Sequence, residues 1–394
     1  MLQHIRQTSI LNKIFNVNVN EWPKIGLAWT INFFYRIGFV LGWTVIVAMF
    51  VSRYGIASLP LLFILNAGFA VIGSVLYSSI LEKFGKEQIM IATIFAAGGL
   101  LFGAMKILPY SEVFFFALVI VAISVFLAQF KINFISYVEE MFNPLQSART
   151  FPLIEASETI GGIGAGLVIT LFSAGLPIVS LIYLWIALLF FIVPLLLFHG
   201  VPIKEEHLSN DKKIGFVSKL KEAFSKAHER SYIKGLFYIV FLQWILFNLL
   251  EFQYTSAVFD NLSHVVRDTG SGFEHALFHD LGTLSVLFSC SALLIQLFLG
   301  SRLIGSLGIF GSMLLHPIVT LLSMIGLTGK FTFLTAILAK NNFTITTVVH
   351  TNAYHSAYYA VDEKARSYVR ELLEGIVRPV GAIIGTLILI ILEK

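Results

Sequence analysis

Cysteine and charge are both scarce in this sequence. One cysteine occurs among 394 residues, and Cys290 lies inside an apolar run, so an intrachain disulfide is excluded. Charged residues make up 13% of the chain, against about 25% in an ordinary soluble domain, while 57% of the residues are apolar. Apolar stretches of about 20 residues recur, which is the length that crosses a bilayer. This composition excludes a soluble globular fold and predicts an all-α integral membrane protein.

Motifs of catalysis and nucleotide hydrolysis are also missing. The glycine clusters follow no strand and no Lys-Ser/Thr pair, which excludes phosphate-binding loops; such small residues instead let membrane helices approach closely. These glycines are Gly161, Gly162, Gly164, Gly166, Gly381 and Gly385. His275 and His279 stand four residues apart, a spacing that can hold zinc, but no third ligand has a motif spacing. We expect neither an enzyme nor an ATP-driven pump, and no cofactor or metal.

The net charge of +4 and the sequence pI near 9.0 reflect basic loops. One face of the expected bundle carries Arg6, Lys13, Lys24, Lys83, Lys86, Arg149, Arg302, Lys364 and Arg366, with seven more lysines and arginines in residues 201–232. Because cytoplasmic loops of membrane proteins are enriched in these residues, we expect a cytoplasmic N-terminus and no nucleic-acid partner. The expected membrane is a bacterial inner membrane or an organellar inner membrane.

Eleven membrane spans are expected from the apolar runs. They lie at 24–52, 57–81, 88–108, 112–138, 149–173, 177–200, 233–259, 281–301, 307–328, 331–359 and 364–392. The expected units are an amphipathic cytoplasmic lead-in (1–23), a six-helix bundle (24–200), a basic cytoplasmic linker (201–232) and a five-helix bundle (233–394), with a polar loop at 260–279.

The two bundles show a trace of internal repetition. A shift of 217 residues lays Ala148-Arg149 on Ala365-Arg366, Gly164-Ala165 on Gly381-Ala382, and Tyr137 on Tyr354. The matches fall in the same order and direction, which indicates parallel repeats related by an axis along the membrane normal.

Ionisable side chains inside the spans mark the expected substrate site, because they are costly in a membrane and normally face a bundle interior. The candidates are Arg36 and Tyr35 in the first span, Lys131, Asn133 and Tyr137 in the fourth, Glu251 in the seventh, and Lys340, Asn341 and His350 in the tenth. This distribution resembles the major facilitator architecture, in which these four helices line a central cavity.

Arg36 and Lys131 are expected to attract an anionic substrate, with Lys131 as an unpaired amine. Lys340, Asn341 and His350 would contribute from the second half, and Trp29, Tyr35 and Tyr137 would stack on a ring. The alternative is that the charged residues neutralise one another as structural salt bridges.

A second polar set lies in the fifth and eleventh spans. Glu155 and Glu158 share a helix face, and Glu371 and Glu374 repeat their spacing. Arg370, Glu374 and Arg378 form a ladder at four-residue steps, which we expect to satisfy itself. The gating or coupling candidates are therefore Glu155, Glu158, Glu251 and Glu374.

Short motifs carry two resemblances. Glu82-Lys83-Phe84-Gly85-Lys86 resembles the acidic-basic-x-Gly-basic loop of major facilitator proteins, with Ser78 in place of the usual preceding glycine. Further motifs resemble the ATP/ADP translocase-like family of nucleotide transporters: Glu21-Trp22-Pro23, Ser147-Ala148-Arg149-x-Phe151-Pro152-Leu153-Ile154, Tyr358-Tyr359-Ala360-Val361, and Glu374-Gly375-Ile376-Val377-Arg378-Pro379. That resemblance implies a transporter of twelve helices and indicates a nucleotide as cargo. We count eleven and expect a native chain that continues past Lys394, or a truncated one.

The sequence thus predicts a major facilitator-like secondary transporter that works by alternating access and moves a small anionic solute such as a nucleotide. Two alternatives stay open. One is a proton-coupled exporter of lipids or amphiphiles, favoured by the 37 phenylalanines. The other is a non-transporting membrane sensor, or an anchor for a missing soluble domain.

Overall fold

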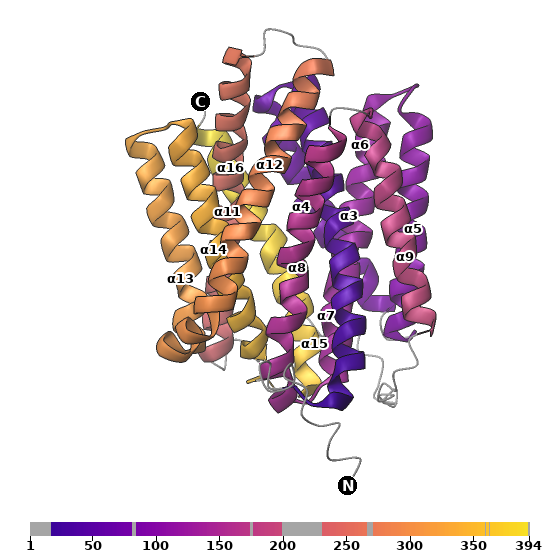
Figure 1. Ribbon diagram of the computed structural model, residues 1–394, viewed down its shortest axis with the longest axis vertical. Helices are drawn as coiled ribbons and strands as arrows, with labels where there is room; N and C mark the ends of the chain where they lie inside the picture. The colour runs from indigo at the N-terminus through magenta and orange to yellow at the C-terminus, as the bar shows by residue number, and fades with distance from the viewer. Residues whose placement is uncertain are drawn as a thin grey trace.

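The structure is a computed structural model that describes residues 17–80, 84–173, 176–198, 231–265, 271–358, 360–361 and 363–392. Most of the expected lead-in (1–16) and linker (201–230), together with Glu82 and Lys83 of the loop motif, lie outside the described residues. The described part is helical and contains no β-strand. Its long helices run side by side, and α3 begins at the opposite end of the bundle from the end of α16 (Figure 1).

The first half of the chain supplies six membrane-length helical segments. They are α3 (Trp22–Tyr54), α4 (Leu59–Ile80), α5 (Lys86–Ile107), the continuous α6 (Glu112–Val121), η3 (Ala122–Leu127) and α7 (Ala128–Met141), then α8 (Pro144–Phe172) and α9 (Leu181–Phe198). Short 3₁₀ turns precede three of them: η1 (Val19–Glu21), η2 (Ile56–Ser58) and η4 (Ile178–Ser180).

The second half supplies five more. They are α11 (Ser231–Val265), α12 (Ser271–Ile295) with η5 (Gln296–Gly300), α13 (Ser301–Gly329), α14 (Phe333–Tyr358), and α15 (Glu363–Leu372), η6 (Leu373–Val377) and α16 (Arg378–Leu392) as one span. Within α13, Gly308 has a φ of 70°, a left-handed conformation that strains residues with a Cβ, and the helix kinks there.

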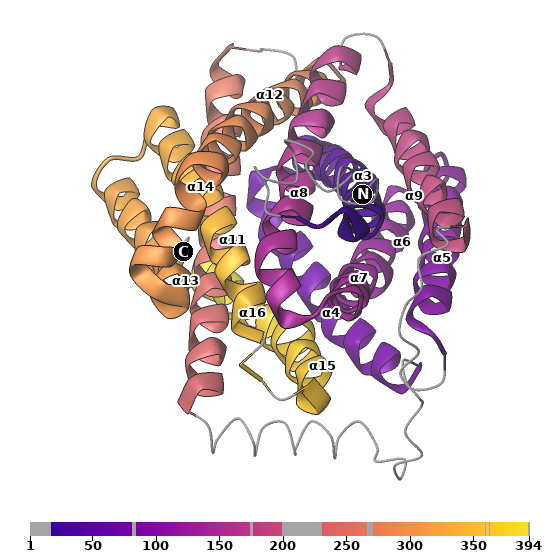
Figure 2. The same ribbon diagram turned by 60° about the horizontal axis from the view of Figure 1, so that its bottom comes forward.

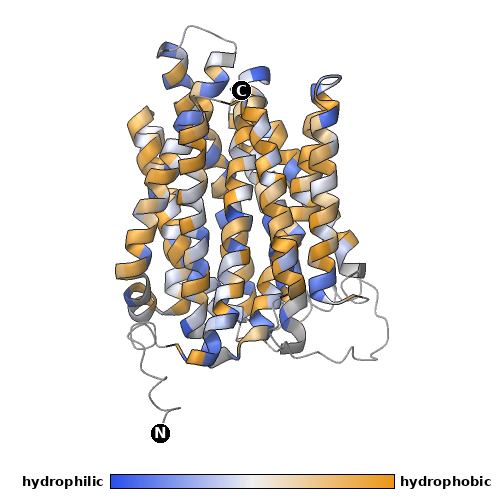
Figure 3. Cartoon of the chain, turned by 45° about the vertical axis from the view of Figure 1, so that its right-hand side comes forward, coloured by the Kyte–Doolittle hydropathy of each residue, from blue (hydrophilic) through white to orange (hydrophobic). Residues whose placement is uncertain are grey.

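Each predicted span overlaps one of these segments, and ten of the described helices are long and apolar enough to cross a membrane. The segment that misses this hydropathy criterion is α14, because its interior carries several polar side chains, among them Lys340 and His350. An apolar band covers the sides of the bundle, and polar residues gather toward its ends (Figure 3). The chain therefore has the form of a multi-pass membrane protein.

The predicted polar loop at 260–279 is wrong for most of its residues. Helix α11 extends to Val265 and α12 begins at Ser271. Polar side chains do not break the helix here, because those of Glu274, His275 and His279 find partners on the first half of the chain. Polarity alone was a poor guide to where this span begins.

At the interface between the halves, the second helix of each half packs against the fifth helix of the other. The fifth helix of the first half, α8, packs along α12, the second of the other half, while α4 packs along α16 (Figure 2). This exchange of second and fifth helices is what a two-fold relation between similar halves produces. Figure 2 shows α3 to α9 on one side of the bundle and α11 to α14 on the other.

The glycines of the sequence repeat occupy equivalent packing positions. A Cβ on Gly164 of α8 would lie 3.3 Å from Ile37 of α3, and one on Gly381 of α16 would lie 2.8 Å from the carbonyl oxygen of Phe241 on α11. The fifth helix therefore packs against the first helix in both halves, through the glycines that the 217-residue shift aligns. Close approach of backbones at small residues is how membrane helices gain packing energy.

A closer contact joins α3 to α9. Trp185 is fully buried, and its ring lies against Gly38 and Gly42. A methyl group on Gly42 would overlap three carbons of that ring. The ring is large and rigid, so it cannot yield as a flexible side chain would.

Replacing Gly42 with Ala should therefore destabilise the protein by about 1–3 kcal/mol, the usual cost of overpacking a core. Gly26→Ala is the matched control, since Gly26 lies in the same helix with nothing within 4 Å of its added Cβ. Thermal unfolding in detergent measures both. Equal melting temperatures for the two variants would contradict this packing.

Candidate functional site

Three charged side chains from three helices meet near the middle of the first half. Lys131 Nζ of α7 donates to Asn32 Oδ1 of α3 at 2.8 Å and lies 3.2 Å from Glu158 Oε2 of α8. Arg36 Nη1 of α3 lies 3.3 Å from the other oxygen of Glu158. We call Arg36, Lys131 and Glu158 the central cluster. The expectation that Lys131 is an unpaired amine is wrong, because two cations share one carboxylate.

The central cluster keeps accessible surface inside the bundle. The exposed fractions are 36% for the Arg36 side chain, 25% for Glu158 and 18% for Lys131. A fully desolvated ion pair would have no such surface. The side chains of the cluster therefore keep surface that a water molecule can contact.

Close packing of α3 on α8 positions the central cluster. A Cβ on Gly161 would lie 3.0 Å from Arg36 Cβ, so a larger residue would push the arginine away from Glu158. Asn32 also donates to Ser157 Oγ at 3.0 Å, which ties its amide beside Lys131. Residues 32 and 36 are one helical turn apart and so present both groups on one face.

Two predicted substrate contacts lie outside the central cluster. Tyr35 is buried, donates to the Leu127 carbonyl at 3.0 Å and stacks on Phe130. Its acceptor lies in the π-helical segment η3, where the ladder of backbone bonds is shifted. Tyr137 donates to Glu87 at 3.0 Å near the end of α7. The third candidate of this group, Asn133, lies in α7 one turn before Tyr137, and it is buried.

The charged residues of the second half form a separate group. Lys340 of α14 is paired with Glu251 of α11, and the side chains of both are 16% exposed. His350 bonds elsewhere: its Nδ1–H donates to the Met313 carbonyl at 3.0 Å. Ten residues separate it from Lys340, which is about 15 Å along a helix. Asn341 is part of the same turn as Lys340, and its buried Oδ1 has no partner among the described residues.

Two contacts join the halves at the end where α3 begins and α7 ends, which we call the proximal end. Arg370 of α15 makes a two-pronged contact with Glu139 of α7, and its guanidinium stacks on Tyr358. His355 Nε2 of α14 lies 3.5 Å from Glu155 Oε1 of α8. We call these two contacts the proximal latch.

The proximal latch shows that the predicted ladder of Arg370, Glu374 and Arg378 does not satisfy itself. Arg370 does lie 3.5 Å from Glu374, but its hydrogen bonds go to the other half of the molecule. Arg378 lies 3.8 Å from the ring centroid of Trp244. Glu139 was missed because it stands at the polar end of a span, where a charge needs no special explanation. The need for such a partner could have been inferred from the span α15–α16, because it carries more cationic side chains than it can pair with its own carboxylates.

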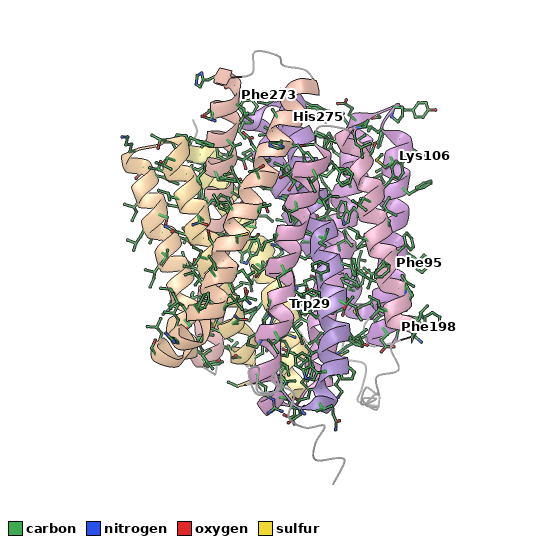
Figure 4. The ribbon with its side chains drawn as sticks, in the orientation of Figure 1. Trp29, Phe95, Lys106, Phe198, Phe273 and His275 are labelled. Carbon is green, nitrogen blue, oxygen red and sulfur yellow. The ribbon has the colours of Figure 1, made fainter. Side chains whose placement is uncertain are left out.

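Contacts at the opposite end, the distal end, join the halves again. Glu274 of α12 accepts from Ser52 at 3.3 Å and lies 3.5 Å from Arg53 Nε, both on α3. His275 donates to the Ser173 carbonyl at 2.7 Å. Figure 4 shows His275 at the end of the bundle where α12 begins, far from Trp29. We call the contacts of Glu274 and His275 the distal latch. His279 lies 2.9 Å from Ser173 Oγ.

Glu371, which repeats the spacing of Glu155 and Glu158 in the sequence but is not among the gating candidates, is a further interior carboxyl. It is buried where α15 meets the first half, and it contacts Ser74 of α4 and Gln129 of α7. Gln129 also donates to Ser74 at 2.6 Å. The carboxyl is thus held by neutral groups of the opposite half.

No family model matches the chain, and no curated protein matches it. Similar solved structures exist. The nucleoside transporter NupG has a TM-score of 0.63 at 16% identity, over 92% of this chain and 90% of that one. A POT family transporter with a thioalcohol-conjugated peptide gives 0.63 at 15%, over 94% and 90%.

A POT family transporter with 5-aminolevulinic acid gives a TM-score of 0.62 at 14% identity, again over 94% of this chain and 90% of that chain. These are structures of transporters, not of enzymes. At such identities the likeness establishes the fold, a helical membrane bundle of the major facilitator type.

The Arg370–Glu139 pair should behave as a coupled unit. Removing one partner of a buried pair leaves an uncompensated charge and costs about 3–5 kcal/mol. We expect Glu139→Gln and Arg370→Gln each to lower the melting temperature strongly, and the double variant to lose less than the sum. Glu112→Gln is the control, because the Arg53–Glu112 pair is partly exposed and should cost under about 1 kcal/mol. Additive losses would show that the pair is not coupled.

Proposed function

We propose that the chain is a secondary transporter that works by alternating access and carries an anionic organic solute. The observation that carries this proposal is the central cluster, in which two cations share one carboxylate at an accessible position inside a membrane bundle. Charges inside a membrane are rarely retained without a function. Arg36 and Lys131 both contact Glu158, so an anionic group of a ligand can take the place of that carboxylate.

A ring-bearing anion such as a nucleotide suits the same face of α3. Trp29 and Phe33 are stacked with ring centroids 4.9 Å apart, and they lie two turns and one turn before Arg36, respectively. Residues four and seven apart lie on one stripe of a helix. A base could stack on this pair while its phosphate reaches the guanidinium. The similar NupG structure is that of a nucleoside transporter.

The two latches supply the gates of the proposed cycle. Both join the halves, one at each end of the bundle, through polar contacts. The distal latch lies beside apolar packing, because Phe273, Leu277 and Phe278 of α12 belong to one buried cluster with residues of the first half. In the proposed cycle one latch opens while the other holds, and water hydrogen-bonds the polar groups that the open latch exposes. The rigid units that rock are the two halves, each held by its glycine-mediated packing of fifth helix on first.

The proximal end is the proposed cytoplasmic face. Lys86 pairs with Glu140 there, and Arg149 pairs with Glu21. The loops richest in lysine and arginine open on that end, as cytoplasmic loops do. The N-terminus would then be cytoplasmic.

Purified protein should gain thermal stability with ATP, ADP or another organic anion, because a ligand that binds only the folded state stabilises it by mass action. Lys131→Ala should weaken the affinity about 10-fold or more, the worth of a charged hydrogen bond. Lys106→Ala at the distal end of α5 is the matched control and should leave the shift unchanged. An unchanged affinity in Lys131→Ala would remove the assignment of the cluster.

Opening of the latches can be followed by spin-label distances in a Cys290→Ser background. Tyr54 and His264 are exposed positions on opposite halves at the distal end, and Phe84 and Ala360 are their proximal counterparts. Glu274→Gln should lengthen the distal distance, because it weakens the distal latch.

Glu139→Gln should lengthen the proximal distance in the same way. In each variant the other distance should stay short, since alternating access opens one end at a time. Simultaneous lengthening at both ends in either variant would argue against alternating gates.

A further inference from the structure

A cation site is built into the second half between α11 and α14. Lys340 Nζ is paired with Glu251 and lies 5.6 Å from the ring centroid of Phe247, 5.5 Å from Tyr254 and 5.2 Å from Phe343. A carboxylate with three aromatic faces is the arrangement that recognises ammonium groups in proteins. We call Glu251, Phe247, Tyr254 and Phe343 the cage.

Neighbours other than Lys340 hold the rings of the cage. Phe247 packs on Trp244 at 4.7 Å between centroids, and Tyr254 packs on Phe288 at 5.7 Å. Phe343 contacts both Phe247 and His316. The rings therefore have supports of their own, and the cage does not depend on the lysine that fills it.

The central cluster has the opposite character. There a carboxylate of the chain, Glu158, sits between two cations; here an ammonium of the chain, Lys340, sits among a carboxylate and three rings. Each half of the molecule thus holds one charged group in a site of complementary charge. The two groups, a carboxylate and a primary ammonium, are the ends of a zwitterion.

We propose that the transported solute bears both an anionic group and an ammonium, which replace Glu158 at the central cluster and Lys340 in the cage. This inference rests on the proposed function and narrows its substrate class from organic anions to amine-bearing anions. Such a ligand contacts both halves at once. Its binding energy therefore depends on how the halves are arranged, which is the requirement for a solute to drive a conformational change.

Both sites lie in the interior of the bundle. Arg36 stands 14 residues into α3, about 21 Å from its start, and Glu251 stands 14 residues before the end of α11, about 21 Å from that end. Both lie well inside helices that are long enough to cross the bilayer. Neither is at a membrane surface, where a lipid headgroup or bulk solvent would compete.

The test uses matched pairs of ligands that differ only in the amine: ethyl phosphate with phosphoethanolamine, and longer alkyl phosphates with their ω-amino counterparts up to six carbons. Binding to the purified full chain is measured by thermal stabilisation and calorimetry. We expect the amino member to bind at least 10-fold more tightly at one chain length, which then reports the span between the sites.

Variants separate recognition from mere stability. Glu251→Gln and Phe247→Leu should abolish the preference for the amino member while leaving alkyl phosphate binding intact. Lys340→Met should strengthen binding of the amino member, because the competing ammonium is gone. A purely structural salt bridge would lower stability in Lys340→Met without changing this preference.

The failure of this inference is distinguishable from failure of the proposed function. Equal binding within every pair, or stabilisation by nucleotides without any amine preference, overturns the zwitterion and leaves an anion transporter. Absence of any shift with alkyl phosphates, amino phosphates and nucleotides alike overturns both. An amine preference that persists in Glu251→Gln overturns the cage as its source.

Discussion

The free-energy cost of keeping an ionised group away from water determines how charged side chains are placed and paired in the interior of this bundle. A charge in a low-dielectric interior is tolerable only beside an opposite charge or a set of hydrogen bonds. The consequence is visible in the pairs Arg36–Glu158 and Lys340–Glu251, each confined to one half. Arg370–Glu139 obeys the same rule across the interface. In the proposed rocking of the halves, pairs within a half would persist, whereas a pair between halves would break.

Helix packing also distinguishes contacts within each half from contacts between the halves. In each half the fifth helix packs on the first through aligned glycines, and α3 closes on Trp185 of α9. These contacts tie the helices of each half closely together. Between the halves, α8 on α12 and α4 on α16 also pack closely, and the ends carry the polar contacts of His275 and His355. In the proposed cycle, close packing within each half would favour rocking of whole halves over internal deformation.

Much of the fold could be predicted from the sequence, because spans follow from the length of apolar runs. The expense of buried charge also made it possible to name Arg36, Lys131, Glu251 and Lys340 as interior residues. Their partners could not be named, since pairing depends on the rotation and depth of each helix, which periodicity leaves open. Lys131 was therefore taken as unpaired and Glu139 was overlooked. The helical start of α12 was hidden because its polar residues are satisfied by the other half.

One turn of α8 belongs both to the proposed binding site and to the proximal latch. Glu158 holds Arg36 and Lys131, while Glu155, three residues earlier, contacts His355 of the other half. The two carboxyls also interact directly. A ligand anion that takes the place of Glu158 releases this carboxylate from its cations and leaves it beside Glu155. In the proposed transporter the local balance of charge around His355 would then change, so occupancy of the site would alter the strength of the latch. In the proposed transporter, a single helical turn would thus connect substrate recognition to the opening of the gate, without any signal passing through the rest of the fold.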